Sequence, residues 1–175
     1  MKRLFIFSVI LIVSNLSAQN RSIPVDTLVT TNHTTKIKGQ TVAYQAQTGT
    51  QPVWNEAGKP IATLFYTYYH RTDVKNGSER PLIFSFNGGP GSASVWMHIA
   101  YTGPKILNID DEGYSIQPYG FKSNPKWIFD VADIVFINPV NTGYSRMLEV
   151  DGEMPDKKQF FGINEDIAYL AEWLT

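Results

Sequence analysis

Residues 81–94 read Pro-Leu-Ile-Phe-Ser-Phe-Asn-Gly-Gly-Pro-Gly-Ser-Ala-Ser, an apolar run followed at once by a glycine-rich turn. The apolar run from Leu82 to Phe86 predicts a short strand that is covered on both faces. Glycines allow backbone angles and close approaches that a Cβ forbids, so the N–H groups of the turn can face outward. Such N–H groups can hold an anion or an oxyanion. The stretch therefore predicts a strand that ends in an anion-binding loop.

Two other interpretations of this turn stay open at this point. Turns of Asn, Gly and Pro between a strand and a helix are common as purely structural features. The turn also resembles the dinucleotide-binding fingerprint G-x-G-x-x-G/A. Gly89, Gly91 and Ser94 have the spacing of that fingerprint, and Asp110 follows at a suitable distance. That match is weak, since serine replaces the last glycine and the helix expected over 92–101 is short.

The first eighteen residues have the three regions of a secretory signal peptide. Lys2 and Arg3 precede the apolar run Leu4 to Val13, and small residues lead up to Ala18. We expect a signal peptide at 1–18 and a folded domain over 19–175. No later segment is long and apolar enough for a membrane span. The sequence thus predicts an exported protein, periplasmic or extracellular.

Composition narrows the classes of function. The chain has 175 residues, 43% of them hydrophobic, which is enough for the core of one modest domain. A net charge of −1 offers no basic field for nucleic acid. Without cysteine there is no disulfide framework and no thiol nucleophile, and three scattered histidines lack metal-ligand spacing. We therefore expect neither a metal nor another cofactor.

The order of the expected elements predicts an α/β fold with a mixed sheet. Polar, antiparallel strands come first, over Lys36–Gln47, with a bend at Gly39, and over Ile61–Tyr69. The strand at 82–86 and an apolar strand at Asp133–Ile137 follow, alternating with helices. A last helix is predicted because apolar side chains recur at helical spacing, with charged side chains on the outside. The apolar positions are Ile163, Ile167, Leu170, Ala171 and Leu174, and the charged ones are Glu165, Asp166 and Glu172.

Two loops occupy the positions where such folds place their sites. The loops Asn87–Gly91 and Asn138–Ser145 each follow an apolar strand, and ligands bind at the carboxyl ends of strands in α/β sheets. If the two strands are neighbours, both loops line one pocket.

These two motifs, in this order, resemble the N-terminal part of the serine carboxypeptidases, peptidase family S10. The motifs are Asn-Gly-Gly-Pro-Gly-Ser-Ala-Ser at 87–94, followed by Gly103-Pro104, and Asn-Pro-Val-Asn-Thr-Gly-Tyr-Ser at 138–145. The resemblance covers about residues 35–175. It implies an α/β-hydrolase fold and the removal of C-terminal residues from peptides by a Ser, Asp, His triad, with a preference for acidic pH.

The resemblance also implies roles for the first loop. Asn87 would bind the carboxylate of the substrate's C-terminus, helped by the backbone N–H of Gly88. Gly89 would donate its N–H to the oxyanion. The expected partner is thus the C-terminus of a peptide or protein. Tyr101 stands where many members carry a Glu that joins the carboxylate-binding network, and Asn141 stands where Gly is frequent.

The nucleophile of the family is not found in this sequence. An α/β-hydrolase presents it in Gly-x-Ser-x-Gly, and residues 113–117 and 143–147 each lack the closing glycine. Ser92 and Ser94 are expected to cap a helix, and His98 is expected to pack against that helix or to solvate it. We expect an inactive fragment with a cut edge at Thr175. The alternatives are a non-catalytic exported binding module or remnant, and an acyltransferase or another hydrolase on the same fold.

Overall fold

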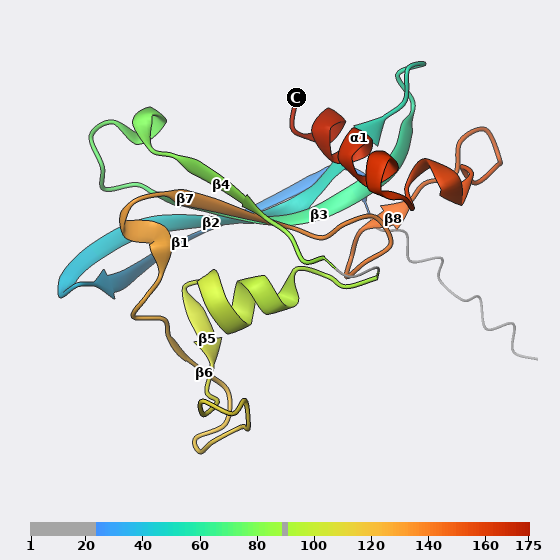
Figure 1. Ribbon diagram of the computed structural model, residues 1–175. Coiled ribbons are helices and arrows are strands. Elements are labelled where there is room, and N and C mark those ends of the chain that lie inside the picture. The colour runs from blue at the N-terminus through green and yellow to red at the C-terminus, as the bar shows by residue number, and fades with distance from the viewer. Residues whose placement is uncertain (1–23, 89–90) are drawn as a thin grey trace, which may run out of the picture.

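The computed structural model describes residues 24–88 and 91–175, and its centre is a mixed sheet of six strands (Figure 1). Five strands follow the order β1-β2-β3-β7-β4, and the short β8 pairs with β3. A separate antiparallel pair is formed by β5 and β6. The strands are β1 Thr27–Ile37, β2 Gln40–Trp54, β3 Pro60–Arg71, β4 Leu82–Ser85, β5 Lys105–Leu107, β6 Phe121–Ser123, β7 Asp133–Ile137 and β8 Arg146–Met147.

The first two strands, β1 and β2, form a long antiparallel hairpin. The single strand expected over 36–47 is wrong, because the chain reverses at Lys38 and Gly39 between β1 and β2. Both residues have positive φ, 49° and 82°, as the tight turn of a two-residue hairpin requires. Gly39 thus forms a full reversal and not a bend, and β1 becomes an additional edge strand.

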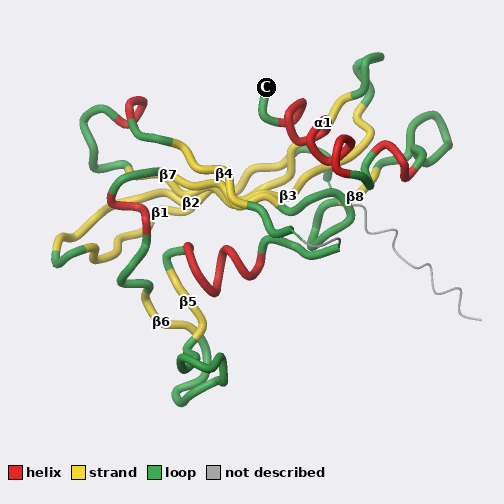
Figure 2. Tube along the Cα trace, viewed as in Figure 1, coloured by secondary structure: helices red, strands yellow, loops and turns green. Residues whose placement is uncertain are grey.

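The pairing of β4 with β7 places the two loops together. β4 lies parallel to β7, with Ile83 opposite Ile134 and Ser85 opposite Phe136. Both strands therefore end at the same edge of the sheet, and the segments that follow them lie side by side there (Figure 2). The condition under which both loops would line one pocket, that the two strands are neighbours, is therefore met.

Two hydrophobic cores cover opposite faces of the sheet. Side chains alternate along β7, so Val135 and Ile137 pack with the helix α1, Ile163–Trp173, on one face. Ile134 and Phe136 belong to the other core, which includes Trp127 and Phe129. On this second face lie β5, β6 and a π-helix, Met97–Thr102 (Figure 1). Short 3₁₀ turns occur at Gly77–Glu79, Ile128–Asp130 and Lys157–Gln159.

The prediction that the strand at 82–86 is covered on both faces is wrong. β4 is an edge strand of the described sheet, and Leu82, Phe84 and Phe86 are 46%, 39% and 49% exposed. These three side chains alternate with Ile83 and Ser85 and so share one face. On the other face Ser85 is buried and Ile83 is partly buried.

The predicted apolar face of the last helix is also wrong. Ile163 and Ile167 are 83% and 63% exposed, whereas Tyr169 and Trp173 are buried against the sheet. The two aromatic side chains are four residues apart and so occupy one face of α1. Because they bury more apolar surface than the aliphatic stripe, they decide which face meets the sheet.

No helix within residues 24–88 and 91–175 is long and apolar enough to cross a lipid bilayer.

Candidate functional site

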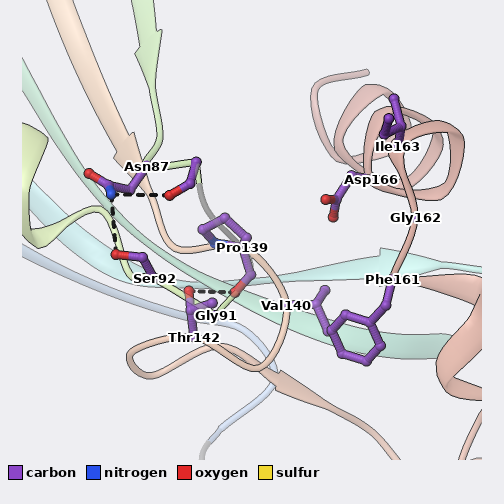
Figure 3. A pocket seen from close by; sticks show the side chains of 11 residues that line it. Asn87, Gly91, Ser92, Pro139, Val140, Thr142, Phe161, Gly162, Ile163 and Asp166 are labelled. Atoms are coloured by element: carbon purple, nitrogen blue, oxygen red, sulfur yellow. Dashed lines mark hydrogen bonds between the residues drawn. The ribbon is translucent and has the colours of Figure 1, made fainter.

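A pocket of about 420 Å³ lies where the loops after β4 and β7 meet the N-terminal end of α1 (Figure 3). Asn87 and Gly88 come from the first loop, so two of the three predicted site residues are brought to it. Gly89, the third, lies outside the described residues. The lining consists of Asn87, Gly88, Gly91, Ser92, Pro139, Val140, Thr142, Phe161, Gly162, Ile163 and Asp166.

Asn87 is half-buried at the start of this pocket. Its side-chain Nδ2 donates to Ser92 Oγ at 3.2 Å and to the Gly88 carbonyl at 3.3 Å (Figure 3). Both distances are at the long end of the normal range, so these bonds are weak. Gly88 is exposed, and a Cβ added there would meet no heavy atom within 4 Å. A ligand can therefore approach the main chain of Gly88 closely.

Ser94 ties the first loop to the end of β7. Its hydroxyl donates to the Ile137 carbonyl and accepts from the Asn87 N–H, whose nitrogen lies 3.2 Å away. Its own N–H donates to Asn138 Oδ1 at 3.0 Å. The expectation that Ser94 caps a helix with its side chain is thus wrong. The helical turns begin three residues later than predicted, at Val95, and end before Gly103 as expected.

The second loop is held by its own serine and asparagine. Ser145 is fully buried, and its hydroxyl donates to the Asn138 carbonyl at 2.6 Å and accepts from the Phe65 N–H at 2.8 Å. Asn141 has φ +59° and accepts from the Met147 N–H through its side chain. Asn tolerates this left-handed conformation well, which explains how it stands in for glycine. Ser145 is a structural residue and not an accessible nucleophile.

Gly143 lies where the two loops pack together, so that an added side chain would collide with both. Its φ is +50°, and an added Cβ would lie 2.3 Å from Asn138 Nδ2. Gly143→Ala is expected to lower the free energy of unfolding by about 2 kcal/mol, from the left-handed conformation and the displaced Asn138 amide. Gly152→Ala is the matched control, because Gly152 also has positive φ but its Cβ would meet nothing closer than 3.9 Å. If urea unfolding shows that both variants lose the same free energy of unfolding, the close contact with Asn138 is not the cause of the loss at Gly143.

The wall opposite the loops is the first turn of α1. Asp166 directs its carboxylate from the helix toward the loops (Figure 3). One turn further on, the Tyr169 hydroxyl accepts from the Val140 N–H at 3.3 Å and so joins α1 to the second loop. Burial, and then the Asp166 carboxylate, raise the pKa of Tyr169, so its phenol stays neutral. The helical pattern predicts Asp166 on the outside of the helix and gives no signal for this wall of the pocket.

His98 lies on the π-helix and packs its ring against the sheet. Its ring stacks on Phe136 with centroids 4.4 Å apart, and its Nε2 lies 2.8 Å from the Tyr69 hydroxyl. Burial lowers the pKa of His98 to about 4. The imidazole is therefore neutral near pH 7 and has a packing role. Tyr101 is 66% exposed and does not line the pocket.

Comparison with known proteins shows to which family the chain belongs. The family model of the serine carboxypeptidases matches residues 38–175, which include both loops and α1. The chain belongs to the serine carboxypeptidase family. Asp110, which the dinucleotide interpretation required, instead accepts from the Tyr114 N–H within a turn of the β5–β6 connection.

Curated relatives in this family come from plants and fungi. Serine carboxypeptidase-like 36 of Arabidopsis thaliana is 29% identical over 118 residues, which are 66% of this chain and 22% of the relative. The pheromone-processing carboxypeptidase KEX1 of Saccharomyces cerevisiae is 31% identical over 104 residues, 59% of this chain and 13% of that protein. The chain therefore spans less than a quarter of these two relatives.

A solved serine carboxypeptidase shares the fold. The crystal structure of a prohormone-processing carboxypeptidase from S. cerevisiae superposes with a TM-score of 0.54 at 26% identity. The match covers 74% of this chain and 26% of that one. The mixed sheet with its flanking helices is thus part of an α/β-hydrolase fold, as the sequence predicted.

Proposed function

We propose that the protein is an exported serine-type carboxypeptidase, which releases C-terminal residues from peptides through an acyl-enzyme. In this proposal the present chain supplies the pocket that receives the substrate's terminal carboxylate and stabilises the oxyanion. The observation that carries it is the convergence of the loops after β4 and β7 on one pocket that contains Asn87 and Gly88.

The carboxylate would bind by replacing weak contacts within the loop. The Asn87 amide donates to two oxygens at 3.2 and 3.3 Å, whereas a carboxylate accepts shorter and stronger hydrogen bonds. The exposed main chain of Gly88 would supply the neighbouring N–H. In the same proposal the Gly89 N–H meets the developing oxyanion, a contribution of about 3–4 kcal/mol per donor.

Asp166 would set the orientation of the substrate in this pocket. Its carboxylate lies on the α1 wall, away from the donors of Asn87 and Gly88 on the loop wall (Figure 3). Like charges repel, so the terminal carboxylate is favoured at the loop and disfavoured at α1. The pocket is therefore electrostatically polar, with its anion-binding end at Asn87.

The sharpest test compares a free with a blocked C-terminus. N-acetyl-dialanine is expected to bind the chain about tenfold more tightly than its C-terminal amide, because only the acid offers a charged acceptor. Asn87→Ala should remove most of this difference. The measurement is a titration followed by ¹H–¹⁵N NMR, with shifts expected at Asn87 and Gly88.

Asn32→Ala is the matched control for this experiment. Asn32 is exposed on β1, far along the sheet from the pocket, and forms no side-chain hydrogen bond within the described residues. It should retain the preference for the acid. Equal binding of acid and amide by the unaltered chain would refute the carboxylate site.

The chain on its own is expected to show no serine hydrolase reactivity. No Gly-x-Ser-x-Gly occurs in the sequence, Ser145 is fully buried, and Ser94 is only 3% exposed. A fluorophosphonate probe followed by intact mass spectrometry should therefore leave the mass of the chain unchanged. Stoichiometric labelling of any serine would contradict the assignment of these serines as structural.

A further inference from the structure

A second cavity, of about 310 Å³, lies on the face of the sheet opposite α1. It opens widely to solvent and is lined by β1, β2 and β3 on one side and by the π-helix, β5 and β6, the elements drawn below the sheet in Figure 1, on the other. None of its lining residues lines the pocket of the proposed carboxylate site. The side chains that matter are His33, Tyr44, Tyr69, His98, Lys105 and Phe121.

Aromatic rings packed against one another make the walls of this cavity rigid. Tyr44 stacks with His33 at 5.2 Å between ring centroids and packs at 6.1 Å against Tyr69. Behind it, the Trp127 ring meets Tyr44 edge-on at 5.2 Å. These contacts hold the buried rings of Tyr44 and Tyr69 in place, and aromatic ring faces suit a flat apolar ligand.

One polar group at this cavity has no partner. Tyr44 is more than nine-tenths buried, and its hydroxyl forms no hydrogen bond with any residue that the structure describes. The hydroxyl itself is not fully enclosed, so a bound molecule can reach it and form a hydrogen bond in place of water. By contrast, the hydroxyl of the neighbouring Tyr69 is paired with His98.

The charge at the cavity mouth has one sign. Lys105, at the start of β5, is the one Lys, Arg, Asp or Glu in the lining, and it forms no ion pair within residues 24–88 and 91–175. Burial keeps the His98 ring uncharged above about pH 4 because it lowers the His98 pKa to about 4. The cavity thus combines flat apolar walls, one unpaired hydroxyl and one ammonium group.

We propose that this cavity binds a small aromatic carboxylic acid, with its ring between the aromatic walls, its carboxylate toward Lys105 and a hydrogen bond to the Tyr44 hydroxyl. The volume suits a single ring with a short acidic side chain. The site is independent of the proposed peptidase function, because it shares no residue with the first pocket.

The test uses two probes of the same shape, 3-phenylpropionate and its uncharged amide. The chain is expected to bind the acid about fivefold more tightly than the amide, measured by calorimetry, with NMR shifts at Tyr44 and Lys105. Lys105→Gln should abolish this difference. Tyr44→Phe should weaken both probes about fivefold and leave their ratio unchanged, because it removes a hydrogen bond and no charge.

Lys122→Gln is the matched control on the same strand pair. Lys122 is exposed on β6 and does not line the cavity, so its variant should bind both probes as the unaltered chain does. Absence of saturable binding at low-millimolar probe, equal affinity for acid and amide, or an unchanged ratio in Lys105→Gln would each overturn the proposal. Lys105 is exposed, so its variant is expected to fold.

Discussion

Asp133→Ala is expected to lower the free energy of unfolding by about 3–5 kcal/mol, because it leaves a buried guanidinium without its counter-ion. Arg80 Nε lies 2.9 Å from Asp133 Oδ1, and the two side chains are only 11% and 8% exposed. The same carboxylate oxygen also accepts from the Arg71 N–H at 3.2 Å. Urea unfolding followed by circular dichroism measures the loss, which is a large part of the stability of an ordinary domain.

Two further variants test whether the loss of stability comes from the burial of the ion pair or from the ion pair alone. Lys59→Ala breaks the exposed pair with Asp151 and should cost less than about 1 kcal/mol. Arg80→Ala combined with Asp133→Ala should cost clearly less than the sum of the two single changes, since neither charge is then left alone. Additive losses, or an Asp133→Ala loss no larger than that of Lys59→Ala, would contradict the explanation.

The Arg80–Asp133 ion pair affects the candidate site because it helps to fix the register of β4 against β7. Asp133 lies opposite Leu82 at the first residues of β7 and β4, and its N–H donates to the Pro81 carbonyl at 2.8 Å. The loops of the pocket leave the other ends of the same two strands. Since a slip of one residue would invert every side chain, the pair at one end keeps Asn87 beside Asn138 at the other.

The adjacency of the two loops could be predicted because it depends on local patterns. A short apolar strand, a turn of glycine, proline and asparagine, and the rule that sites lie at carboxyl strand ends were enough to expect that the loops at 87–91 and 138–145 share a pocket if their strands are neighbours. The parallel pairing of β4 with β7 confirms the step on which this expectation depended. The roles of Asn87, Gly88 and Gly89 stay predictions.

What the sequence could not show is which faces become covered. Leu82 and Phe84 satisfy the pattern of a buried strand, but their exposure depends on the neighbours of β4 in space. Likewise, Ile163 and Ile167 form a valid helical stripe, yet Tyr169 and Trp173 form a competing one that meets the sheet. Helical periodicity alone does not rank two apolar faces of one helix.

The same limit explains the missed wall of the pocket. Asp166 is a charged residue in the first turn of a helix, which usually indicates a solvated position that favours the helix dipole. Only the packing of α1 beside the loops turns it toward the pocket. The role of Ser94 was missed for a related reason, because its hydroxyl bonds to β7, forty-three residues away in sequence.

Acidification is expected to destabilise the fold through His98. Burial lowers its pKa to about 4, whereas an unfolded chain has a histidine pKa near 6.5. Between pH 6.5 and 4 the unfolded state therefore binds a proton that the folded state does not, so stability falls as the pH falls. The loss reaches about 3 kcal/mol near pH 4 and levels off below it, where the folded state is protonated as well.

His98→Gln isolates this contribution, because glutamine stays neutral and can still pair with the Tyr69 hydroxyl. The free energy of unfolding of this variant, measured by urea titration at a series of pH values, should change less than that of the unaltered chain between pH 6.5 and 4. His70→Gln, on the same strand as Tyr69 but with a partly exposed ring, controls for the loss of a histidine. If the free energy of unfolding falls equally for His98→Gln and for the unaltered chain between pH 6.5 and 4, His98 does not cause the loss of stability in acid.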